Sequence, residues 1–331
     1  MEDAMQKIIE ILIIVLSLLI SINLAGAQQT AQFPRVGVLG KGTFTGLQAR
    51  IKILQEGLKG SGYVEAQNIS FEYRFADGQG ERLPSLAAEL VELDVDVIVA
   101  LGCPSANAAK EATNTIPIVI SSANPVMTGL VSSFARPGGN VTGMTIMTGS
   151  EFYSKRLELL KQIAPSATVV AILWNPDIDS HQLALEGLRN TAAGFDLELL
   201  PLDAKEPDDL DRAYATMKRE KPGGLLNFGD TLFSAHRKQI ANFAIENKLP
   251  TNFTHSGFVK AGALMSYGPN PTSLYVRLGN YVGKVLNGVK PADLPIEQPV
   301  TFDLNINLKT AEKIGLVIPP EVLLQATNVI K

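Results

Sequence analysis

The sequence has very little cysteine and histidine. Cys103 is the single cysteine among 331 residues, which excludes a disulfide framework, a cysteine-built zinc site and an iron–sulfur cluster. The three histidines, His181, His236 and His255, are far apart and show no HExxH-type spacing. A histidine-built metal centre is therefore not expected either, and we predict neither a metal nor a cofactor.

Neither sign of charge dominates the chain. Lys and Arg number 29 against 33 Asp and Glu, a net charge of −4, and no stretch concentrates the basic residues. The electrostatic footprint of nucleic-acid binding is therefore missing, and we expect no nucleic-acid partner. Hydrophobic residues make up 46% and charged residues 19%, which excludes long disorder. The length suits about two domains of roughly 150 residues each.

Only one long hydrophobic run is present, and it lies near the N-terminus. Residues 11–24 are almost entirely apolar and are followed by Ala25-Gly26-Ala27. A short apolar region that ends in an A-x-A site is typical of a secretory signal peptide. We therefore predict that residues 1–27 are a signal peptide, and that the mature protein is exported to the periplasm and soluble.

The residues before this run fit the signal peptide less well. Residues 1–10 hold three acidic side chains and one lysine, whereas the start of a signal peptide should be positive. Translation from Met5 would leave Lys7 and the free amine against Glu10 alone, which fits better. An uncleaved anchor remains the alternative, although a spanning helix usually needs about 20 apolar residues.

The rest of the chain alternates short apolar runs with longer amphipathic stretches. Apolar runs that are continuous rather than alternating indicate parallel strands covered by helices on both faces. In the first half these runs are 36–39, 69–76, 95–101 and 116–120, and after the turn at 136–140 the pattern restarts with 169–174, 197–202, 224–228 and 250–253.

This pattern predicts an α/β protein with two doubly wound parallel-sheet lobes. The N-terminal lobe is predicted at 33–145, completed by about 266–298, and the C-terminal lobe at 146–265, completed by about 299–331. The chain would then cross between the lobes near 141–148, 262–268 and 298–306. Several crossovers make a hinge, with a ligand cleft between the lobes.

Motifs of the common α/β enzymes are absent. The turn that begins Gly40-Lys41-Gly42 has Thr45 at the third glycine position of a dinucleotide fingerprint, and no acid ends the second strand. Neither a Walker A loop nor a G-x-S-x-G elbow occurs. Cys103 lies where a strand meets a helix, without a base that can be placed beside it. We therefore predict that the protein is not an enzyme.

The loops that follow the predicted strands carry an inventory suited to binding. Open α/β sheets bind ligands outside the carboxyl ends of their strands. These loops offer hydroxyls, amides, the only tryptophan and one clear carboxylate, without a nucleophile and base together. The residues predicted to bind ligand are Thr43, Thr45, Ser105, Ser121, Ser122, Asn124, Trp174, Asn175, Asp230 and Thr254.

Each of these residues also has a structural interpretation. Asp230 can accept a hydrogen bond from a ligand ammonium, or it can cap the helix that begins near Phe233, and the two roles are compatible. Trp174 can stack on ligand or fill the core. The hydroxyl and amide side chains at strand ends can cap the helices that follow them.

Five stretches in order carry a family resemblance over nearly all of the chain after Arg35: 57–69, 136–143, 155–160, 261–268 and 307–311. The sequence resembles the exported substrate-binding proteins of ABC transporters, in the family that includes tryptophan- and tyrosine-type binding proteins. The resemblance implies two α/β lobes of the type I periplasmic binding protein kind. It also implies a small-molecule ligand closed between the lobes, and a membrane permease as partner to a monomeric receptor.

One departure from the family concerns the ligand. Relatives often have Asp-Pro where this chain has Asn124-Pro125. A neutral amide at 124 removes one possible partner for a ligand amine, so an aromatic amino acid is not carried over as the ligand. A periplasmic sensor for a membrane signalling partner would have the same binding chemistry and remains an alternative, as does, with less support, an α/β enzyme with an unrecognised site.

Overall fold

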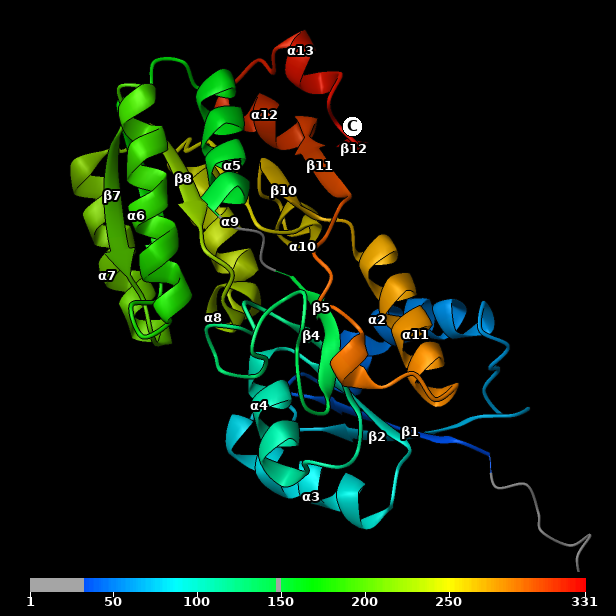
Figure 1. The fold of residues 1–331 in the computed structure, drawn as a ribbon. Coiled ribbons are helices and arrows are strands. Elements are labelled where there is room, and N and C mark those ends of the chain that lie inside the picture. Colours follow the sequence, from blue (N-terminus) through cyan, green and yellow to red (C-terminus); the bar gives the residue numbers. More distant parts are fainter. Residues whose placement is uncertain (1–32, 147–149) are drawn as a thin grey trace, which may run out of the picture.

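The computed structural model describes residues 33–146 and 150–331. The predicted signal peptide at 1–27 and part of the first predicted crossover lie outside the described residues. Figure 1 shows two α/β lobes joined end to end by several passes of the chain. The predicted fold class, two lobes built on parallel sheets with helices between the strands, is confirmed.

The first lobe is built on a five-stranded sheet in the order β2-β1-β3-β4-β5, and every neighbouring pair is parallel. The strands β3 and β4 are wholly buried, as expected for runs of Val, Ile and Leu with helices on both faces. The strand bounds are β1 Arg35–Gly40, β2 Ser70–Phe75, β3 Val97–Leu101, β4 Ile118–Ser122 and β5 Val141–Thr145.

Helices cover both faces of this sheet. One face packs against α2 and α11, and the other packs against α3 and α4. Gly57 and Gly279 allow α2 and α11 to approach closely, because a Cβ at either position would collide with the backbone of the other helix. The bounds are α2 Phe44–Lys59, α3 Leu83–Glu92, α4 Cys103–Ala112 and α11 Pro271–Leu286, with short 3-10 turns η1 Gly80–Arg82 and η2 Pro291–Asp293.

The second lobe is built on a seven-stranded sheet in the order β12-β11-β10-β9-β8-β6-β7. All neighbouring pairs are parallel except β10 and β11, which are antiparallel. The bounds are β6 Val169–Trp174, β7 Glu198–Asp203, β8 Gly224–Asn227, β9 Thr251–Phe253, β10 Met265–Pro269, β11 Phe302–Asn307 and β12 Asn328–Ile330.

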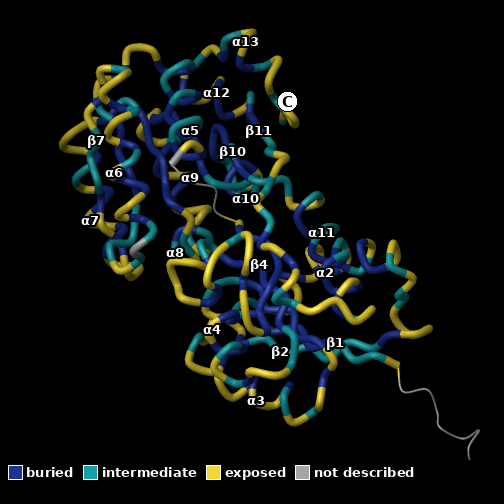
Figure 2. The backbone as a smooth tube through the Cα atoms, viewed as in Figure 1, coloured by how far each residue is buried: buried dark blue, intermediate teal, exposed yellow. Residues whose placement is uncertain are grey.

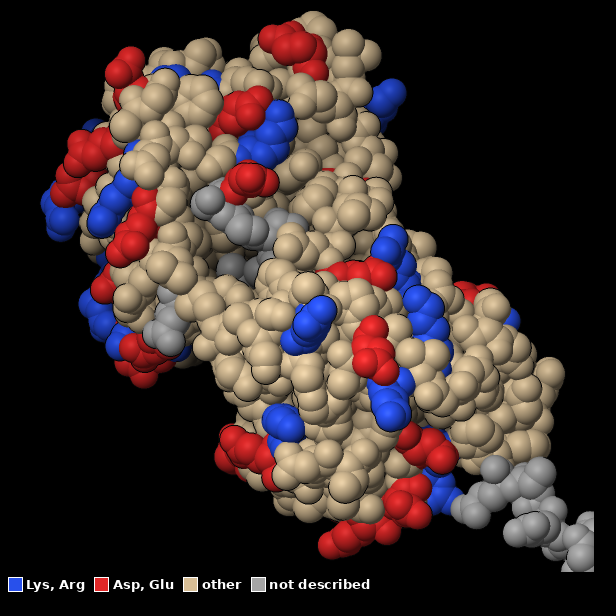
Figure 3. Space-filling view, viewed as in Figure 1, with Lys and Arg blue, Asp and Glu red and all other residues tan. Residues whose placement is uncertain are grey.

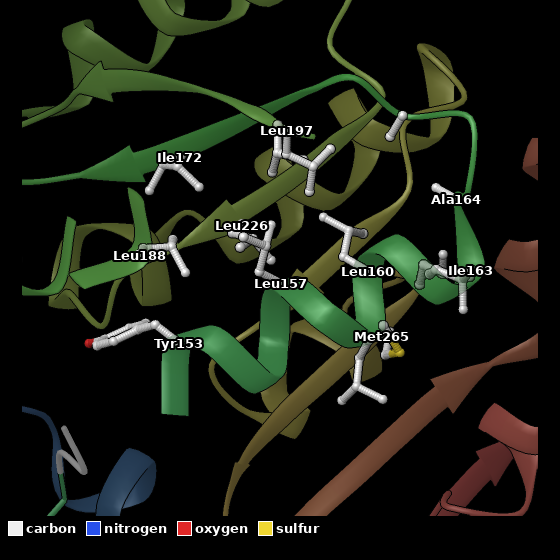
Figure 4. Packing of buried hydrophobic residues seen from close by; sticks show 14 of the residues in the cluster. Tyr153, Leu157, Leu160, Ile163, Ala164, Ile172, Leu188, Leu197, Leu226 and Met265 are labelled. Carbon is white, nitrogen blue, oxygen red and sulfur yellow. The ribbon is translucent and has the colours of Figure 1, made fainter. Parts of the chain in front are cut away.

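Two buried clusters lie on the two faces of the second sheet. One packs under α5 and α6 and reaches the C-terminal helices, and the other packs under the helices from α7 to α10. Figure 4 shows side chains of α5, among them Leu157 and Leu160, packed toward the sheet residue Leu226. The bounds are α5 Ser150–Ile163, α6 Asp179–Gly194, α7 Pro207–Glu220, α8 Thr231–Ala235, α9 Arg237–Glu246, α10 Ser256–Lys260, α12 Leu308–Ile314 and α13 Pro320–Leu323.

The chain crosses between the lobes three times: between β5 and α5, between β10 and α11, and between η2 and β11. The second crossing follows Pro269, later than the expected 262–268, because all of β10 pairs with β9 or β11 of the second sheet. Asn270 fixes this point, since its side chain caps α11 through Ser273 N at 2.7 Å. The segment after β10 that packs against the first lobe therefore begins with α11.

The buried residues follow the strands of both lobes, as the dark-blue stretches of the tube in Figure 2 show. Within residues 33–146 and 150–331, no helix is both long and apolar enough to cross a membrane.

Candidate functional site

The topology of each sheet identifies where a ligand would be expected. In the first sheet the crossovers run in opposite directions from the boundary between β1 and β3, and in the second from the boundary between β6 and β8. Ligands of open α/β sheets bind outside the carboxyl ends of strands at such reversal points. Figure 3 shows a hollow between the two lobes on the face drawn. Six of the ten predicted residues lie at the last residue of these four strands, in the loops after them or in the first helical turns that follow: Thr43, Thr45, Ser105, Trp174, Asn175 and Asp230.

Asp230 and Asn175 are in direct contact on the second lobe. Oδ2 of Asp230 accepts a hydrogen bond from Nδ2 of Asn175 at 3.0 Å. Oδ1 of Asp230 accepts one from the backbone N–H of Leu232 at 2.6 Å, and this caps α8. The capping role proposed from the sequence is thus present. Oγ1 of Thr231 donates a longer hydrogen bond to Oδ1 at 3.5 Å. A carboxylate has about four lone-pair directions, so about one remains for a ligand donor.

His181 lies behind this pair and holds it in place. The imidazole is buried, and its Nδ1 accepts a hydrogen bond from the backbone N–H of Asn175 at 3.1 Å. Nε2 therefore carries the proton and donates to the carbonyl of Gly229 at 3.2 Å. Burial lowers the pKa of His181, against smaller opposing effects from Gly229, Asp230 and Asn175. This role was not predicted from the sequence, where the six-residue spacing between Asn175 and His181 is the only local signal.

Arg156 is fully buried at the ends of β8 and β9. Its Nη1 donates to the carbonyl of Asn227 at 2.7 Å, and its Nη2 donates to Oδ1 of Asn227 at 3.2 Å and to the carbonyl of Asn252. Its Nε has no hydrogen-bond partner among the described residues. Burial lowers the pKa of Arg156 to about 9. The guanidinium thus carries a positive charge directly under the carboxyl ends of two strands.

The predicted residue Thr254 connects to this arginine. Its backbone N–H donates to Oδ1 of Asn227 at 3.2 Å, the same oxygen that receives Nη2 of Arg156. Asn227 and Asn252 are buried polar residues that the sequence analysis did not single out. Their position inside apolar strands was the available signal, because a buried amide in a strand requires specific partners.

The sequence left two roles open for Trp174: stacking on a ligand or filling the core. Its ring is partly buried and packs against the core under α5 and α6. The buried indole Nε1 has no hydrogen-bond partner within the part of the chain that the structure describes. Core filling is therefore observed, and ligand stacking by this ring stays a prediction.

Helix capping also accounts for some of the predicted ligand-binding residues of the first lobe. Oγ1 of Thr43 accepts from the backbone N–H of Gly46 at 3.1 Å and caps α2, while Thr45 is exposed in the first turn of that helix. Ser122 donates from Oγ to Sγ of Cys103 at 3.1 Å, which links β4 to the start of α4. These contacts fix the start of α2 and join the end of β4 to the start of α4.

The remaining first-lobe residues differ in their environment. Ser121 and Ser105 are buried, and Oγ of Ser105 has no hydrogen-bond partner among the described residues. Asn124 is partly buried and has φ of +36°, an uncommon value for a residue other than glycine and more so directly before Pro125. A strained residue of this kind on a strand-end loop is consistent with a binding role.

A separate groove on the second lobe does not include any predicted residue. It lies between α5 and α6 and has a volume of about 540 Å³. Four of its polar side chains pair with one another: Lys155 with Glu158 at 2.8 Å, and Ser154 with Thr191 at 2.6 Å. Among the described residues, no group of three or more His, Cys, Asp or Glu is arranged to hold a metal ion.

Comparison with known proteins agrees with this arrangement. The model of the family described as ABC transporter substrate binding protein matches residues 36–330. The tyrosine-binding protein of Clostridioides difficile strain R20291 is 28% identical over 262 residues, which cover 78% of this chain and 74% of that protein.

Solved structures are similar over nearly the whole described chain. A conserved domain protein from Vibrio cholerae has 29% identity and a TM-score of 0.82, covering 90% of this chain and 100% of that one. An ABC domain from Streptococcus pneumonia in complex with L-Trp has 24% identity and a TM-score of 0.82, with the same coverage. A ligand-free, open substrate-binding protein with adhesive properties from Clostridium difficile has 25% identity and a TM-score of 0.72, covering 90% and 99%.

These findings establish the class of the protein. The chain shares its two-lobed α/β fold with these solved structures. The chain belongs to the family of ABC transporter substrate-binding proteins.

Proposed function

We propose that this protein captures a small polar ligand with an ammonium group between its two lobes and delivers it to the membrane permease of an ABC importer. It acts as an exported periplasmic receptor, without catalytic activity or cofactor. The observation that carries the ligand class is the carboxylate of Asp230, held at the reversal point of the second sheet by Asn175 and by the cap of α8.

The chemistry of this carboxylate selects a cation. In a closed cleft from which water is partly excluded, a charge-assisted hydrogen bond from an ammonium is stronger than a neutral one. The amide and hydroxyl groups of the first-lobe loops supply uncharged partners for the rest of the ligand. Amino acids fit this inventory: one relative is a tyrosine-binding protein, and one similar structure is a complex with L-Trp.

Calorimetric titration of the mature protein with the common amino acids, matching amines and small organic acids tests the proposal. We expect saturable binding of at least one amino acid, and no binding of the organic acid that lacks its amine. Binding only of ligands without an amine would contradict the role of Asp230.

Transport is tested separately from binding. Deleting the gene should abolish uptake of the radiolabelled ligand, and a plasmid copy should restore it. Unchanged uptake together with a lost transcriptional response to the ligand would instead identify a sensor.

A further inference from the structure

Three of the four sheet edges in the described residues are protected against pairing with another chain. At β5 the segment before β11 covers the edge: the backbone N–H of Thr145 donates to the carbonyl of Glu297 at 2.9 Å, and that of Glu297 donates to the carbonyl of Gly143 at 3.0 Å. In the second sheet, β7 contains Pro201, which has no backbone N–H, and β12 is only three residues long. Covered, proline-bearing and short edges all discourage a further strand.

The fourth edge, β2, carries no such protection. Its six residues include no proline, and they pair with β1 in an unbroken register. All six are partly exposed, whereas the residues of β5 are buried. Among the described residues, no strand lies on the other side of β2. An open strand of this length presents a row of unpaired backbone groups on which another strand can form.

The backbone of β2 shows which groups face this open edge. The N–H groups of Ser70 and of Ala76, which follows the strand, donate to carbonyls just before β1 and at its last residue, at 2.9 and 3.0 Å. Successive residues of a strand direct their backbone groups to opposite edges, so the odd-numbered residues of β2 direct theirs away from β1. In agreement, the carbonyl of Tyr73 accepts a hydrogen bond from Nη1 of Arg74 at 3.0 Å.

The side chains of β2 form a pattern that is symmetric about Tyr73. Phe71 and Phe75 flank it on the face that packs toward α2, and their ring centroids lie 5.8 and 6.2 Å from that of Tyr73. Glu72 and Arg74 flank it on the opposite face. Charged side chains normally discourage edge pairing, but these two have opposite signs. The strand is therefore complementary to a second copy that runs antiparallel to it.

An antiparallel pair of β2 strands centred on Tyr73 uses both patterns. The two Tyr73 residues exchange both N–H···O bonds, and so do Phe71 of one copy and Phe75 of the other, because these backbone groups face the open edge. Glu72 of one copy lies opposite Arg74 of the other in a non-hydrogen-bonded pair, where side chains are closest. Centring the pair on Glu72 or on Arg74 instead would set like charges opposite each other, which destabilises a sheet.

We infer that the open edge of β2 is an interface with a second copy of this chain, and that the two five-stranded sheets join across a two-fold axis. A two-fold interface requires one self-complementary patch, and the register centred on Tyr73 supplies it. The strands of the two sheets run in opposite directions, so the two clefts face opposite ways and neither is shared. The interface goes beyond the proposed function, requires no ligand, and differs from the monomeric receptor that the family resemblance implies.

Arg74 changes partners when the second copy pairs. Its Nε donates to Glu89 of α3 at 2.7 Å, and this ion pair is kept. The carbonyl of Tyr73 receives a backbone N–H of the second copy in place of Nη1 of Arg74. The freed Nη1 then faces Glu72 of that copy.

Sedimentation equilibrium of the mature protein, from low micromolar to near-millimolar concentration, tests the interface. We expect a reversible monomer–dimer equilibrium in the wild type. Glu72→Arg sets positive charges opposite each other and Arg74→Glu sets negative ones, so each should weaken the dimer roughly tenfold or more. The double variant restores opposite charges and should restore the dimer. Glu81→Arg, an exposed position just beyond β2, serves as the control.

A monomer at every concentration overturns the inference. So does a dimer that both single reversals leave intact, because it forms through another surface. Arg74→Glu also loses its bond with Glu89, so urea unfolding of each variant is measured as well. If that variant does not fold, Glu72→Arg decides alone, since it leaves the bond to α3 in place.

Amide hydrogen exchange followed by NMR reads the register directly. As the protein concentration rises, exchange of the N–H groups of Phe71, Tyr73 and Phe75 should slow, because they become bonded to the second copy. The N–H groups of the even-numbered residues face β1, so their exchange should not depend on concentration. If the odd-numbered residues do not respond either, β2 is not the interface, even where a dimer is present.

Discussion

Nδ2 of Asn175, just after β6, donates a 3.0 Å hydrogen bond to Oδ2 of Asp230, just after β8. The two side chains come from strands that are neighbours in the sheet but about 50 residues apart in the chain. This bond holds the carboxylate from one side, while the cap of α8 holds it from the other. The carboxylate of Asp230 is therefore oriented before a ligand binds, which reduces the conformational entropy lost on binding.

Replacing Asp230 with Asn should weaken binding of an ammonium ligand by roughly 30-fold or more. Losing one partner of a buried charge pair typically costs about 2–5 kcal/mol, and 1.4 kcal/mol is about tenfold. Asparagine keeps an acceptor for Leu232 but loses the one that serves Nδ2 of Asn175, so the free energy of unfolding of the free protein should fall by about 1 kcal/mol, less than the loss in binding. Asp203→Asn at the end of β7 removes an exposed carboxylate and serves as the control in calorimetric titration. Unchanged affinity in Asp230→Asn would remove this residue from the site.

His181 should make the stability of the fold depend on pH. Its pKa in the folded protein is below the value of about 6.5 in an unfolded chain, so the unfolded state binds more protons in between. Stability is therefore full above pH 6.5 and falls as the pH falls through this window, by at most about 1.4 kcal/mol per pH unit. His181→Gln should reduce the slope of urea unfolding free energy against pH, and the slope that remains belongs to the other histidine with a lowered pKa, His255, whose pKa burial lowers to about 4. An unchanged slope in His181→Gln would assign the dependence to other groups.

Arg156 should be required for the stability of the second lobe. Arg156→Met leaves the carbonyls of Asn227 and Asn252 without their buried donors, and each unsatisfied group costs about 1–3 kcal/mol. We expect a loss of at least about 2 kcal/mol in urea unfolding, against less than about 0.5 kcal/mol for Arg189→Met on the surface of α6. A loss as small as that of the control would show that the strand ends satisfy themselves in another way.

The alternation of elements could be predicted from the sequence because apolar runs define the strands. Asn175 and Asp230 were each predicted at a strand end, but their hydrogen bond was not, because the order of β6 and β8 in the sheet leaves no local signal. Arg156 was missed because Lys155 and Arg156 look alike in a helix, and only packing decides which one turns inward. The second crossing was misplaced because β10 is held by an antiparallel partner, β11, that begins more than 30 residues later. Pairing at that distance leaves no local signal.

Processing should remove residues 1–27. The apolar run and Ala25-Gly26-Ala27 predict cleavage after Ala27. Intact-mass measurement on protein recovered from the periplasm should therefore match a chain that begins at Gln28. A recovered chain that still carries the N-terminal segment would refute cleavage and favour a membrane anchor.

Ligand binding should make the molecule more compact by rotating the two lobes toward each other. Two of the three crossings about which the lobes would rotate are hydrogen-bonded to one another. The backbone N–H of Asn270, in the second crossing, donates to the carbonyl of Thr301 in the third at 2.9 Å. Nδ2 of Asn270 also donates to the carboxylate of Asp303 at 2.9 and 3.0 Å. Passes that are bonded to one another cannot separate, but small changes in their backbone angles can rotate one lobe toward the other.

A ligand that contacts both lobes binds the closed arrangement better and shifts the population toward it. Small-angle scattering should therefore give a smaller radius of gyration when the protein is saturated with a ligand verified by calorimetry. Asp230→Asn, measured at the same ligand concentration below its own dissociation constant, should keep the larger radius. An unchanged radius in the saturated wild-type protein would mean that the ligand binds one lobe alone, which would contradict closure of the two lobes around it.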